Sequence, residues 1–312
     1  MNYEKLENEN RLLIEARLRP IQGTRFQPTG FPNLGAADYV TSDGTQMLLV
    51  ESPQSMANRL EKVCWDDVQN ELVPALRGIS YIRVKDSDGN LLTTSVEEAH
   101  RINSPYILEG KNKEFLDRLK KDLEAEEKGR PDYKLLAKVL FRYDINSLIH
   151  GVFLAKKELA NGRLRVARSL SSFVEANNVT VASSGGVKKD DLDVKGDATK
   201  GFGHVPFSRE EYTGEITAYF NLDLAQIRGY GLGRAAEELM VAISLYKIRK
   251  LLDEGLRFRT ACDLELVDVS VKRPKEYIIP TTSEIEKILP GLIEQASSGF
   301  ADPAVTEVTY VE

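Results

Sequence analysis

Residue types that mark several functional classes are scarce in this sequence of 312 residues. It has only two cysteines, Cys64 and Cys262, which lie far apart and predict two buried thiols in a reducing compartment. Its three histidines form no Cys/His cluster, so we expect no metal site. Apolar runs are too short to span a bilayer, and the polar N-terminus MNYEKLENEN lacks the apolar stretch of a signal peptide. We therefore expect a cytoplasmic protein without a membrane partner.

Signatures of catalysis are also missing. The sequence has no G-x-S-x-G, no H-E-x-x-H and no Walker loop ending in Gly-Lys-Ser/Thr. The stretch RGYGLG at 228–233 does place glycines between a strand and a helix, but as G-x-G-x-G and without a succession of βα units. We therefore expect no catalytic residue and no cofactor, and we interpret the glycines as allowing a tight turn. Arg228 and Arg234 flank them and are candidates for contact with an RNA phosphate.

Positive charge is in deficit, because the net charge is −6, and this argues at first against nucleic acid. The acids gather at the ends, however: residues 1–10 hold three acids and one base, and residues 282–312 hold six acids and one lysine. The rest of the chain is close to neutral and contains clusters of bases, each of which alone is typical of a solvated surface. The clustered bases are Arg17, Arg19 and Arg25, and then Lys156, Lys157, Arg163, Arg165 and Arg168.

What is present is the hydrophobic periodicity of an α+β fold. Alternating apolar residues predict strands at 11–19, 215–223 and 263–272, and helical spacing predicts a helix at about 232–252. A strand and a helix at about 46–65 and a helical insertion complete the pattern. This order is compatible with a ferredoxin-like sheet, β-α-β-β-α-β, that carries insertions.

The middle of the chain supplies the insertion. The stretch ISYIRVKDSDGNLLTTS predicts a hairpin with Asp-Gly in its turn, and Ser95 with Glu98 predicts a capping box that opens a helix. Residues 112–128 and the stretch DYKLLAKVLFRY predict further helices. SLIHGVFLA is typical of a strand, whereas RLRVARSLSSFVEANNV fits a helix or a strand.

The helix that follows the strand QMLLV is a candidate anion site. Ser52 is a good N-cap and Pro53 suits the first helical position. Unpaired backbone N–H groups at such a start favour a phosphate, although an ordinary capped surface helix is the alternative. The polar residues of its first turns are Ser52, Gln54, Ser55, Asn58 and Arg59.

Two long segments with few apolar residues are predicted to be exposed. Residues 20–44 are punctuated by Gly and Pro and carry Arg25 and Phe26, which favours a functional loop. Residues 183–214 are rich in Gly, Ser and Asp and predict a long excursion outside the core. This excursion contains Asp190, Asp191 and Asp193, which could bind a metal, although such residues in a polar loop more often only solvate it.

Five stretches together resemble a known family over roughly residues 11–275. They are LRPIQGTRFQPTGFPNLG, LLVESPQSMANRLEKVCWD, EAHRINSPYI, GRLRVARSLSSFVEANNV and ITAYFNLDLAQIRGYGL. The sequence resembles the CRISPR-associated RAMP superfamily, and within it the backbone (crRNA-binding repeat) subunit of the type I-G (formerly I-U) Cascade complex. Other type I backbone subunits share a looser pattern, S-x-Q-S at a helix start and a late N-L-A-Q strand end, which here correspond to Ser52, Gln54 and Ser55 and to 224–226.

The resemblance implies a ferredoxin-like (RRM-like) palm with a helical fingers insertion and a long thumb loop. Several copies would polymerise as a helical filament along one crRNA, hold its phosphate backbone and present its bases to target DNA in antiviral defence. The thumb of one copy would fold over the RNA held by the next. The implied boundaries are 1–65, 150–182 and 214–275 for the palm, 66–149 for the fingers, 183–213 for the thumb and 276–312 for an acidic C-terminal helix and tail.

The family's RNA contacts carry over to Ser52 and Gln54. A lysine that often touches RNA in related systems is replaced here by Ala57, and Arg59 or Lys62 could substitute for it. Combined with the basic clusters and the two exposed segments, the predicted RNA-binding residues are Arg19, Arg25, Phe26, Ser52, Gln54, Ser55, Asn58, Arg59, Arg163, Arg165, Arg168, Arg228 and Arg234. The predicted thumb residues are Phe202, His204 and Phe207.

The resemblance also implies the partners. These are crRNA, target DNA through the crRNA, copies of the chain itself, a large subunit, a crRNA-processing end-cap subunit and a recruited helicase-nuclease. Backbone subunits of type I systems are not nucleases. Those of type III systems resemble them and cut RNA with a thumb aspartate, so the alternative is a metal-dependent ribonuclease that uses Asp190, Asp191 or Asp193.

Overall fold

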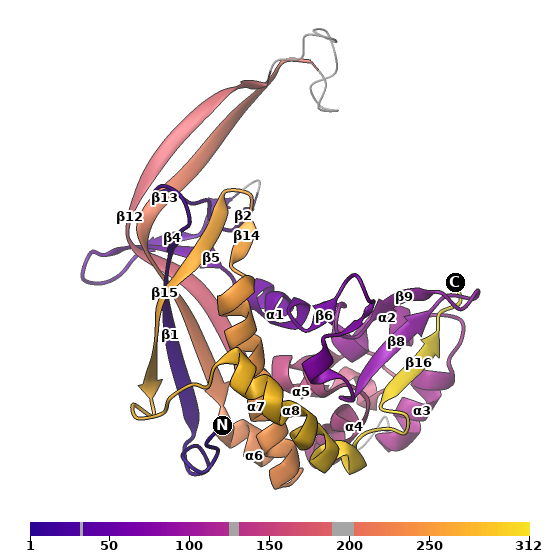
Figure 1. Ribbon diagram of the computed structural model, residues 1–312. Coiled ribbons are helices and arrows are strands. Elements are labelled where there is room, and N and C mark those ends of the chain that lie inside the picture. Colours follow the sequence, from indigo (N-terminus) through magenta and orange to yellow (C-terminus); the bar gives the residue numbers. More distant parts are fainter. Residues whose placement is uncertain (32–33, 125–130, 189–202) are drawn as a thin grey trace.

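An antiparallel sheet of seven strands organises the protein, whose computed structural model describes residues 1–31, 34–124, 131–188 and 203–312 (Figure 1). The predicted alternation of the first strand is confirmed, since Leu12, Ile14, Ala16 and Leu18 are buried on one face. In sheet order the strands are β14 (Arg257–Arg259), β15 (Cys262–Arg273), β1 (Arg11–Pro20), β13 (Val205–Asp223), β12 (Leu170–Lys188), β5 (Gln46–Glu51) and β4 (Asp38–Val40).

Two helices pack on one face of this sheet. α1 (Pro53–Lys62) contacts β12, and α7 (Arg234–Glu254) contacts β13, β15 and α1. α8 (Thr282–Ala296) packs on the far side of α7, so that the helices form layers to the right of the sheet in Figure 1. Because α7 is enclosed by the sheet and by other helices, it buries apolar residues around most of its circumference.

The order of elements along the chain fits the β-α-β-β-α-β pattern. The six elements are β1, α1, β12, β13, α7 and β15. In the sheet β15 lies beside β1, β1 beside β13 and β13 beside β12, and all three pairs are antiparallel. The structure therefore confirms the predicted α+β class.

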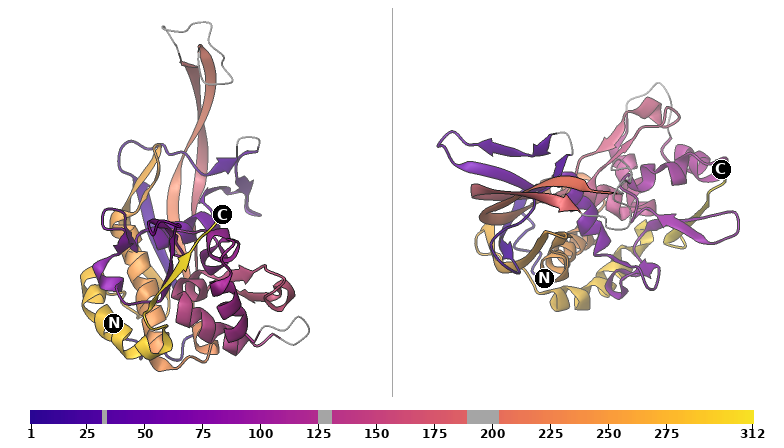
Figure 2. Two further views of the ribbon diagram at one scale, coloured as in Figure 1. Left: turned by 90° about the vertical axis from the view of Figure 1, so that its right-hand side faces the viewer. Right: turned by 90° about the horizontal axis from the view of Figure 1, so that it is seen from above.

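A helical block lies beside the sheet and is built from residues between α1 and β12, joined by the C-terminal strand (Figures 1 and 2). Its helices are α2 (Pro105–Leu108), α3 (Glu114–Asp122), α4 (Tyr133–Tyr143) and α5 (Ile145–His150), with 3₁₀ turns at Pro74–Leu76, Arg101–Asn103 and Ala160–Gly162. Its strands are β6 (Trp65–Asp66), β7 (Glu71–Leu72), β8 (Tyr81–Lys85), β9 (Leu91–Thr94), β10 (Val152–Leu154), β11 (Leu164–Val166) and β16 (Val305–Thr309).

Three local predictions are wrong in this block. Ser95 caps no helix, because its hydroxyl accepts a hydrogen bond from the Ile82 amide at 3.1 Å and so joins the β8–β9 hairpin. The stretch SLIHGVFLA is not one strand: α5 ends at His150, the chain turns at Gly151 with φ +79°, and β10 follows. The C-terminal residues are not only a helix and tail, since β16 pairs in parallel with β8.

The outer halves of β12 and β13 form a two-stranded ribbon that projects from the sheet (Figures 1 and 2). Their pairing continues from Thr180 opposite Thr213 to Lys188 opposite Val205. The sequence predicted a loop over 183–213, but the paired strands satisfy each other's backbone groups, so extended structure forms without apolar alternation. Asp190, Asp191, Asp193 and Phe202 lie outside the described residues.

The shorter elements complete the description. The segment between β1 and β5 contains a small hairpin, and α6 joins β13 to α7. A last 3₁₀ turn, Ser297–Gly299, ends α8. The remaining elements are β2 (Gly30–Phe31), β3 (Gly35–Ala36) and α6 (Leu224–Gly229). None of the helices in the described parts of the chain is long and apolar enough to cross a membrane.

Candidate nucleic-acid interface

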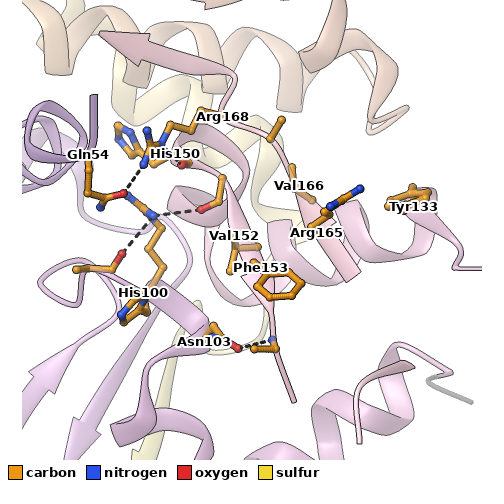
Figure 3. A pocket seen from close by; sticks show the side chains of 15 residues that line it. Gln54, His100, Asn103, Tyr133, His150, Val152, Phe153, Arg165, Val166 and Arg168 are labelled. Atoms are coloured by element: carbon orange, nitrogen blue, oxygen red, sulfur yellow. Dashed lines mark hydrogen bonds between the residues drawn. The ribbon is translucent and has the colours of Figure 1, made fainter. Parts of the chain in front are cut away.

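A basic pocket of about 810 Å³ lies where the start of α1 meets the helical block (Figure 3). Its inner end is formed by Gln54, His150 and Arg168, and its outer end by Phe153 and Arg165. Among the described residues that line it, none is a carboxylate. The pocket therefore brings together three of the predicted RNA-binding residues, Gln54, Arg165 and Arg168, in a site that favours an anion.

The helix start places Gln54 at the pocket. Ser52 adopts an extended backbone and its hydroxyl accepts the Ser55 amide at 3.2 Å, which confirms the predicted N-cap. The first turn contains no acid, so no side chain within that turn offsets the positive end of α1. Gln54 donates from Nε2 to Asn58 Oδ1 at 3.2 Å and accepts a short hydrogen bond from Arg168.

The guanidinium of Arg168 is fixed in the pocket by two acceptors. Its Nε donates to the carbonyl oxygen of His150 at 3.2 Å, and its Nη2 donates to Oε1 of Gln54. Neither acceptor carries a negative charge, so the positive charge of Arg168 stays uncompensated at this contact. Burial and the nearby charge of Arg101 lower the pKa of Arg168, against the opposing charge of Glu61.

The residues before β12 are anchored by carbonyls at the end of α5 and by a glutamine from α6. Ser169 donates from its amide to Ile149 at 3.0 Å and from its hydroxyl to Leu148 at 3.0 Å. Gln226 donates to the carbonyl of Ala167 at 2.6 Å. The glutamines of the two family motifs, Gln54 and Gln226, thus hold the neighbouring residues Arg168 and Ala167.

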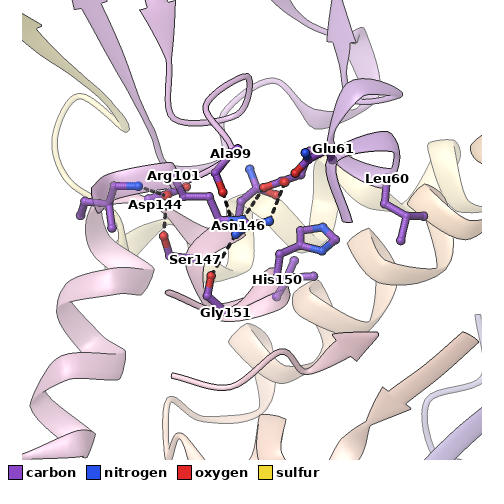
Figure 4. Close-up of polar contacts among 12 residues, drawn as sticks. Leu60, Glu61, Ala99, Arg101, Asp144, Asn146, Ser147, His150 and Gly151 are labelled. Atoms are coloured by element: carbon purple, nitrogen blue, oxygen red, sulfur yellow. Dashed lines mark hydrogen bonds and ion pairs between the residues drawn. The ribbon is translucent and has the colours of Figure 1, made fainter. Parts of the chain in front are cut away.

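A cluster of charged side chains is buried beneath the pocket (Figure 4). Arg101 forms a two-point ion pair with Glu61, with distances of 2.7 and 2.8 Å, and also donates to the Gly151 carbonyl. Lys247 of α7, fully buried, contacts Asn146 and lies with Nζ 2.8 Å from Nε2 of His150. As an ammonium, Lys247 can only donate, which makes Nε2 of His150 the acceptor and puts the proton of the neutral ring on Nδ1. Nδ1 has no hydrogen-bond partner among the described residues, and burial lowers the pKa of Lys247.

Burial decides the protonation of this cluster. Desolvation lowers the pKa of His150 well below its ordinary value of 6.5, and the neighbouring cations Lys247, Arg101 and Arg168 lower it further. Desolvation raises the pKa of Glu61 to about 7, against the opposing charges of Arg101 and Lys247. The cluster ties α1, α5, α7 and the turn at Arg101 together below the pocket floor.

Several other predicted contacts are engaged within the chain. Arg19 pairs with Glu265 at 2.6 Å and Arg25 with Glu211 at 3.2 Å. Arg59 contacts the buried carboxylate of Glu51 at 3.0 Å and the carbonyl of Phe258 at 2.6 Å. Their charges are therefore partly or wholly balanced by the protein itself, and their contact with RNA stays a prediction.

Four more of the predicted contacts do not line the pocket, and one of them is closed to RNA by burial. Phe26 is fully buried and bridges to Tyr212, so its ring belongs to the core and is closed to RNA. Arg228 lies near Asn10, and Arg234 pairs with Glu7 and Glu238, so the flanks of the glycine turn face the acidic N-terminus. Arg163 donates to the carbonyl of Ala160 and does not line the pocket.

Of the thumb residues, Phe202 lies outside the described residues, His204 is exposed, and Phe207 lies on β13 opposite Gly186. Within the described ranges no group of three His, Cys, Asp or Glu residues could hold a metal ion. Asp190, Asp191 and Asp193 fall outside these ranges.

Sequence reasoning missed the aromatic part of the pocket. Phe153 and Tyr133 are 53% and 55% exposed and line it together with His100 and Asn103. The sequence predicted only that Phe153 lies in a strand. Such exposure of an aromatic ring is visible only when the neighbouring elements are placed.

The chain with this α+β fold, basic pocket and projecting ribbon matches a known protein family. The chain belongs to the family described as CRISPR-associated protein GSU0053, whose model matches residues 12–181. The predicted CRISPR-associated family is thereby confirmed.

Solved structures give more distant similarities. One chain of a "CRISPR RNA-guided surveillance complex, pre-nicking" has 14% identity and a TM-score of 0.42, covering 92% of this chain and 89% of that chain. Csc2 of Thermofilum pendens has 12% identity and a TM-score of 0.34, covering 96% of this chain and 82% of that chain. No curated protein matches the sequence. The family assignment therefore comes from the family model.

Proposed function

We propose that the protein is a non-catalytic backbone subunit of a type I CRISPR Cascade surveillance complex, in which several copies line up along one crRNA. The observation that carries this proposal is the pocket at the start of α1, whose described lining contains no carboxylate. There Arg165 and Arg168 meet Gln54, one of the two residues to which the family's RNA contacts carry over. Family membership supplies the CRISPR context.

The architecture supports the roles of its parts. The β15-β1-β13-β12 order is that of a ferredoxin-like sheet, so we assign it to the palm. The helical block corresponds to the fingers, and the ribbon of β12 and β13 to the base of the thumb.

The chemistry of the pocket suits a phosphate backbone. Arginine presents a planar set of donors that matches phosphate oxygens, and Arg168 is already oriented by two neutral acceptors. Contacts to phosphates do not depend on base identity, so bases remain available for pairing with target DNA. Affinity for each copy can be modest, since binding along one RNA is multivalent.

The partners follow from this role. They are crRNA, target DNA paired with it, further copies of the chain, a large subunit, a crRNA-processing end-cap subunit and a helicase-nuclease that joins the complex. The overall acidity of the chain fits this role too, because a subunit that packs on copies of itself needs acidic as well as basic faces.

The test is to express the protein with its CRISPR array and partner subunits and to extract the bound nucleic acid. We expect RNA of uniform length. Arg168→Ala should reduce the amount of bound RNA, whereas Arg17→Ala, a change on strand β1 outside the pocket, should not. Recovery of no RNA, or of RNA without a defined length, would contradict the proposal.

Absence of catalysis is a separate part of the proposal. The assembled complex is incubated with complementary RNA and Mg²⁺ or Mn²⁺, and we expect no cleavage. Cleavage at regular intervals that is lost in Asp190→Ala, Asp191→Ala or Asp193→Ala would favour the ribonuclease alternative instead.

A further inference from the structure

The outer end of the pocket is an exposed aromatic ring beside a cation. Phe153 of β10 is paired in register with Arg165 of β11, so both side chains leave the same face of this short hairpin. Figure 3 shows them on the same side of the pocket, away from Gln54 and Arg168. Among the described residues, the side chain of Arg165 has no hydrogen-bond or ion-pair partner.

Phe153 is exposed although the strand that carries it is well packed. Its neighbours Val152 and Leu154 are buried, so β10 is seated in the protein and directs only Phe153 into the pocket. Because the ring is 53% exposed, the free protein does not gain the hydrophobic free energy that burial of the whole ring would give. A ligand with a planar apolar face would bury the ring and gain that free energy.

Polar groups beside the ring complete the site. Asn103 accepts the Ala155 amide on its Oδ1 at 3.1 Å, which orients the side chain and leaves its Nδ2 to donate to a ligand. His100 is exposed and also lines the pocket. An aromatic face, a cation and hydrogen-bonding groups on one rim are the combination that binds single-stranded nucleic acid by stacking.

We propose that Phe153 stacks against one base of single-stranded RNA in each subunit, while Arg165 contacts the adjoining phosphate. This inference rests on the proposed RNA-binding function and adds a base contact to a site that was argued from phosphates alone. Every base offers a planar face, so the contact tolerates any guide sequence. It makes the pocket a two-part site, with phosphate held at Arg168 and Arg165 and a base held at Phe153.

The test compares two probes that carry the same phosphates. One is a labelled oligouridine of about 12 nucleotides, and the other is an abasic oligomer of the same length. Binding of the full chain is measured by fluorescence anisotropy for wild type, Phe153→Ala, Phe153→Trp, Arg165→Ala and Arg168→Ala. Ile278→Ala, which truncates an apolar side chain that is 85% exposed and does not line the pocket, is the matched control.

We expect Phe153→Ala to weaken oligouridine binding by about tenfold, and Phe153→Trp to retain it. The abasic oligomer should bind wild type and Phe153→Ala equally, because it has no base to stack. Equal weakening on both probes, or no weakening on oligouridine, would overturn the stacking proposal. If Arg165→Ala and Arg168→Ala change neither probe, the phosphate site itself is contradicted, so the two failures are distinguishable.

Discussion

His150 is the residue whose surroundings most directly predict a pH effect on stability. It is the last residue of α5, is fully buried, and lies near cations of three other segments, Lys247, Arg101 and Arg168. Burial and these charges hold its pKa well below 6.5 in the folded protein. The unfolded chain therefore binds a proton below pH 6.5 that the folded protein excludes.

We expect the wild type to lose stability as the pH falls below 6.5, with a slope of about 1.4 kcal/mol per pH unit from this residue. The free energy of unfolding in urea at about pH 7.5 and about pH 5.5 is compared between wild type and His150→Gln. The variant should lose about 1.4 kcal/mol less over this interval. Glu61, Asp144 and Lys247, whose pKa values burial also shifts, are present in both proteins, so the comparison isolates the change at His150. Parallel pH profiles would contradict the assignment.

Arg165 and Arg17 are both exposed arginines, yet only Arg165 faces the pocket. Arg17 pairs with Asp268 on the sheet. For Arg165→Ala we expect weaker RNA binding and a smaller salt dependence, with the slope of log K against log salt reduced by about 0.7 for one lost contact to single-stranded phosphate. Arg17→Ala should leave the slope unchanged. Equal slopes for wild type and Arg165→Ala would remove Arg165 from the interface.

At the scale of elements, the start of β12 is placed by two helices that are remote in sequence. Gln226 of α6 donates to the Ala167 carbonyl and to the Tyr230 hydroxyl, at 2.6 and 2.7 Å. Gln54 of α1 accepts from Arg168. The turn before β12 thus gains its orientation from α6 and α1 together, and Gln226 acts on the pocket only through the backbone.

Gln226→Leu removes both donated hydrogen bonds while keeping the size of the side chain. We expect weaker RNA binding, because Ala167 and with it Arg168 lose their fixed position. If Gln226 acts through Arg168, the double variant with Arg168→Ala should bind no more weakly than Arg168→Ala alone. Gln295→Leu, an exposed position on α8, is the control. Additive losses in the double variant would show that Gln226 has a separate role.

At the scale of the whole molecule, the ribbon is distinct from the packed body. Buried apolar residues gather between the sheet and the helices, whereas Val181 and Val187 on the ribbon are 52% and 54% exposed. The ribbon reaches far beyond the sheet in Figure 2. It is therefore available for contact with RNA or with another copy while contributing little to the core.

Replacing residues 183–210 by Asn-Gly should leave a folded protein. Ala182 and Glu211 are register partners, so a two-residue turn can join them. We expect an unfolding midpoint close to that of wild type and unchanged binding of a short oligouridine at the pocket. Assembly of several copies on long guide RNA, followed by light scattering, should be lost. Normal assembly would show that the ribbon is not the thumb, and failure to fold would assign it to the core.

Local sequence determined the elements whose signals are short-range. The alternation of β1, the Ser52 cap with Pro53 and the long helix α7 follow from periodicity and capping chemistry within each segment. The same local signals misled at Ser95, where a neighbouring strand offered its hydroxyl a better partner than a helix start. Motif resemblance also identified the family that the family model confirms.

Only the tertiary structure decided which of these residues share a site. Gln54 and Arg168 are 114 residues apart, and Lys247 and His150 are 97 apart, yet each pair is in contact. Phe26 and Arg59 were predicted RNA contacts like Arg168, and no local sequence feature distinguished them from it. Packing buries the ring of Phe26 and pairs the side chain of Arg59 with a carboxylate inside the protein. The physical reason is that exposure and charge balance depend on neighbours brought together by sheet pairing and helix packing, which no local pattern encodes.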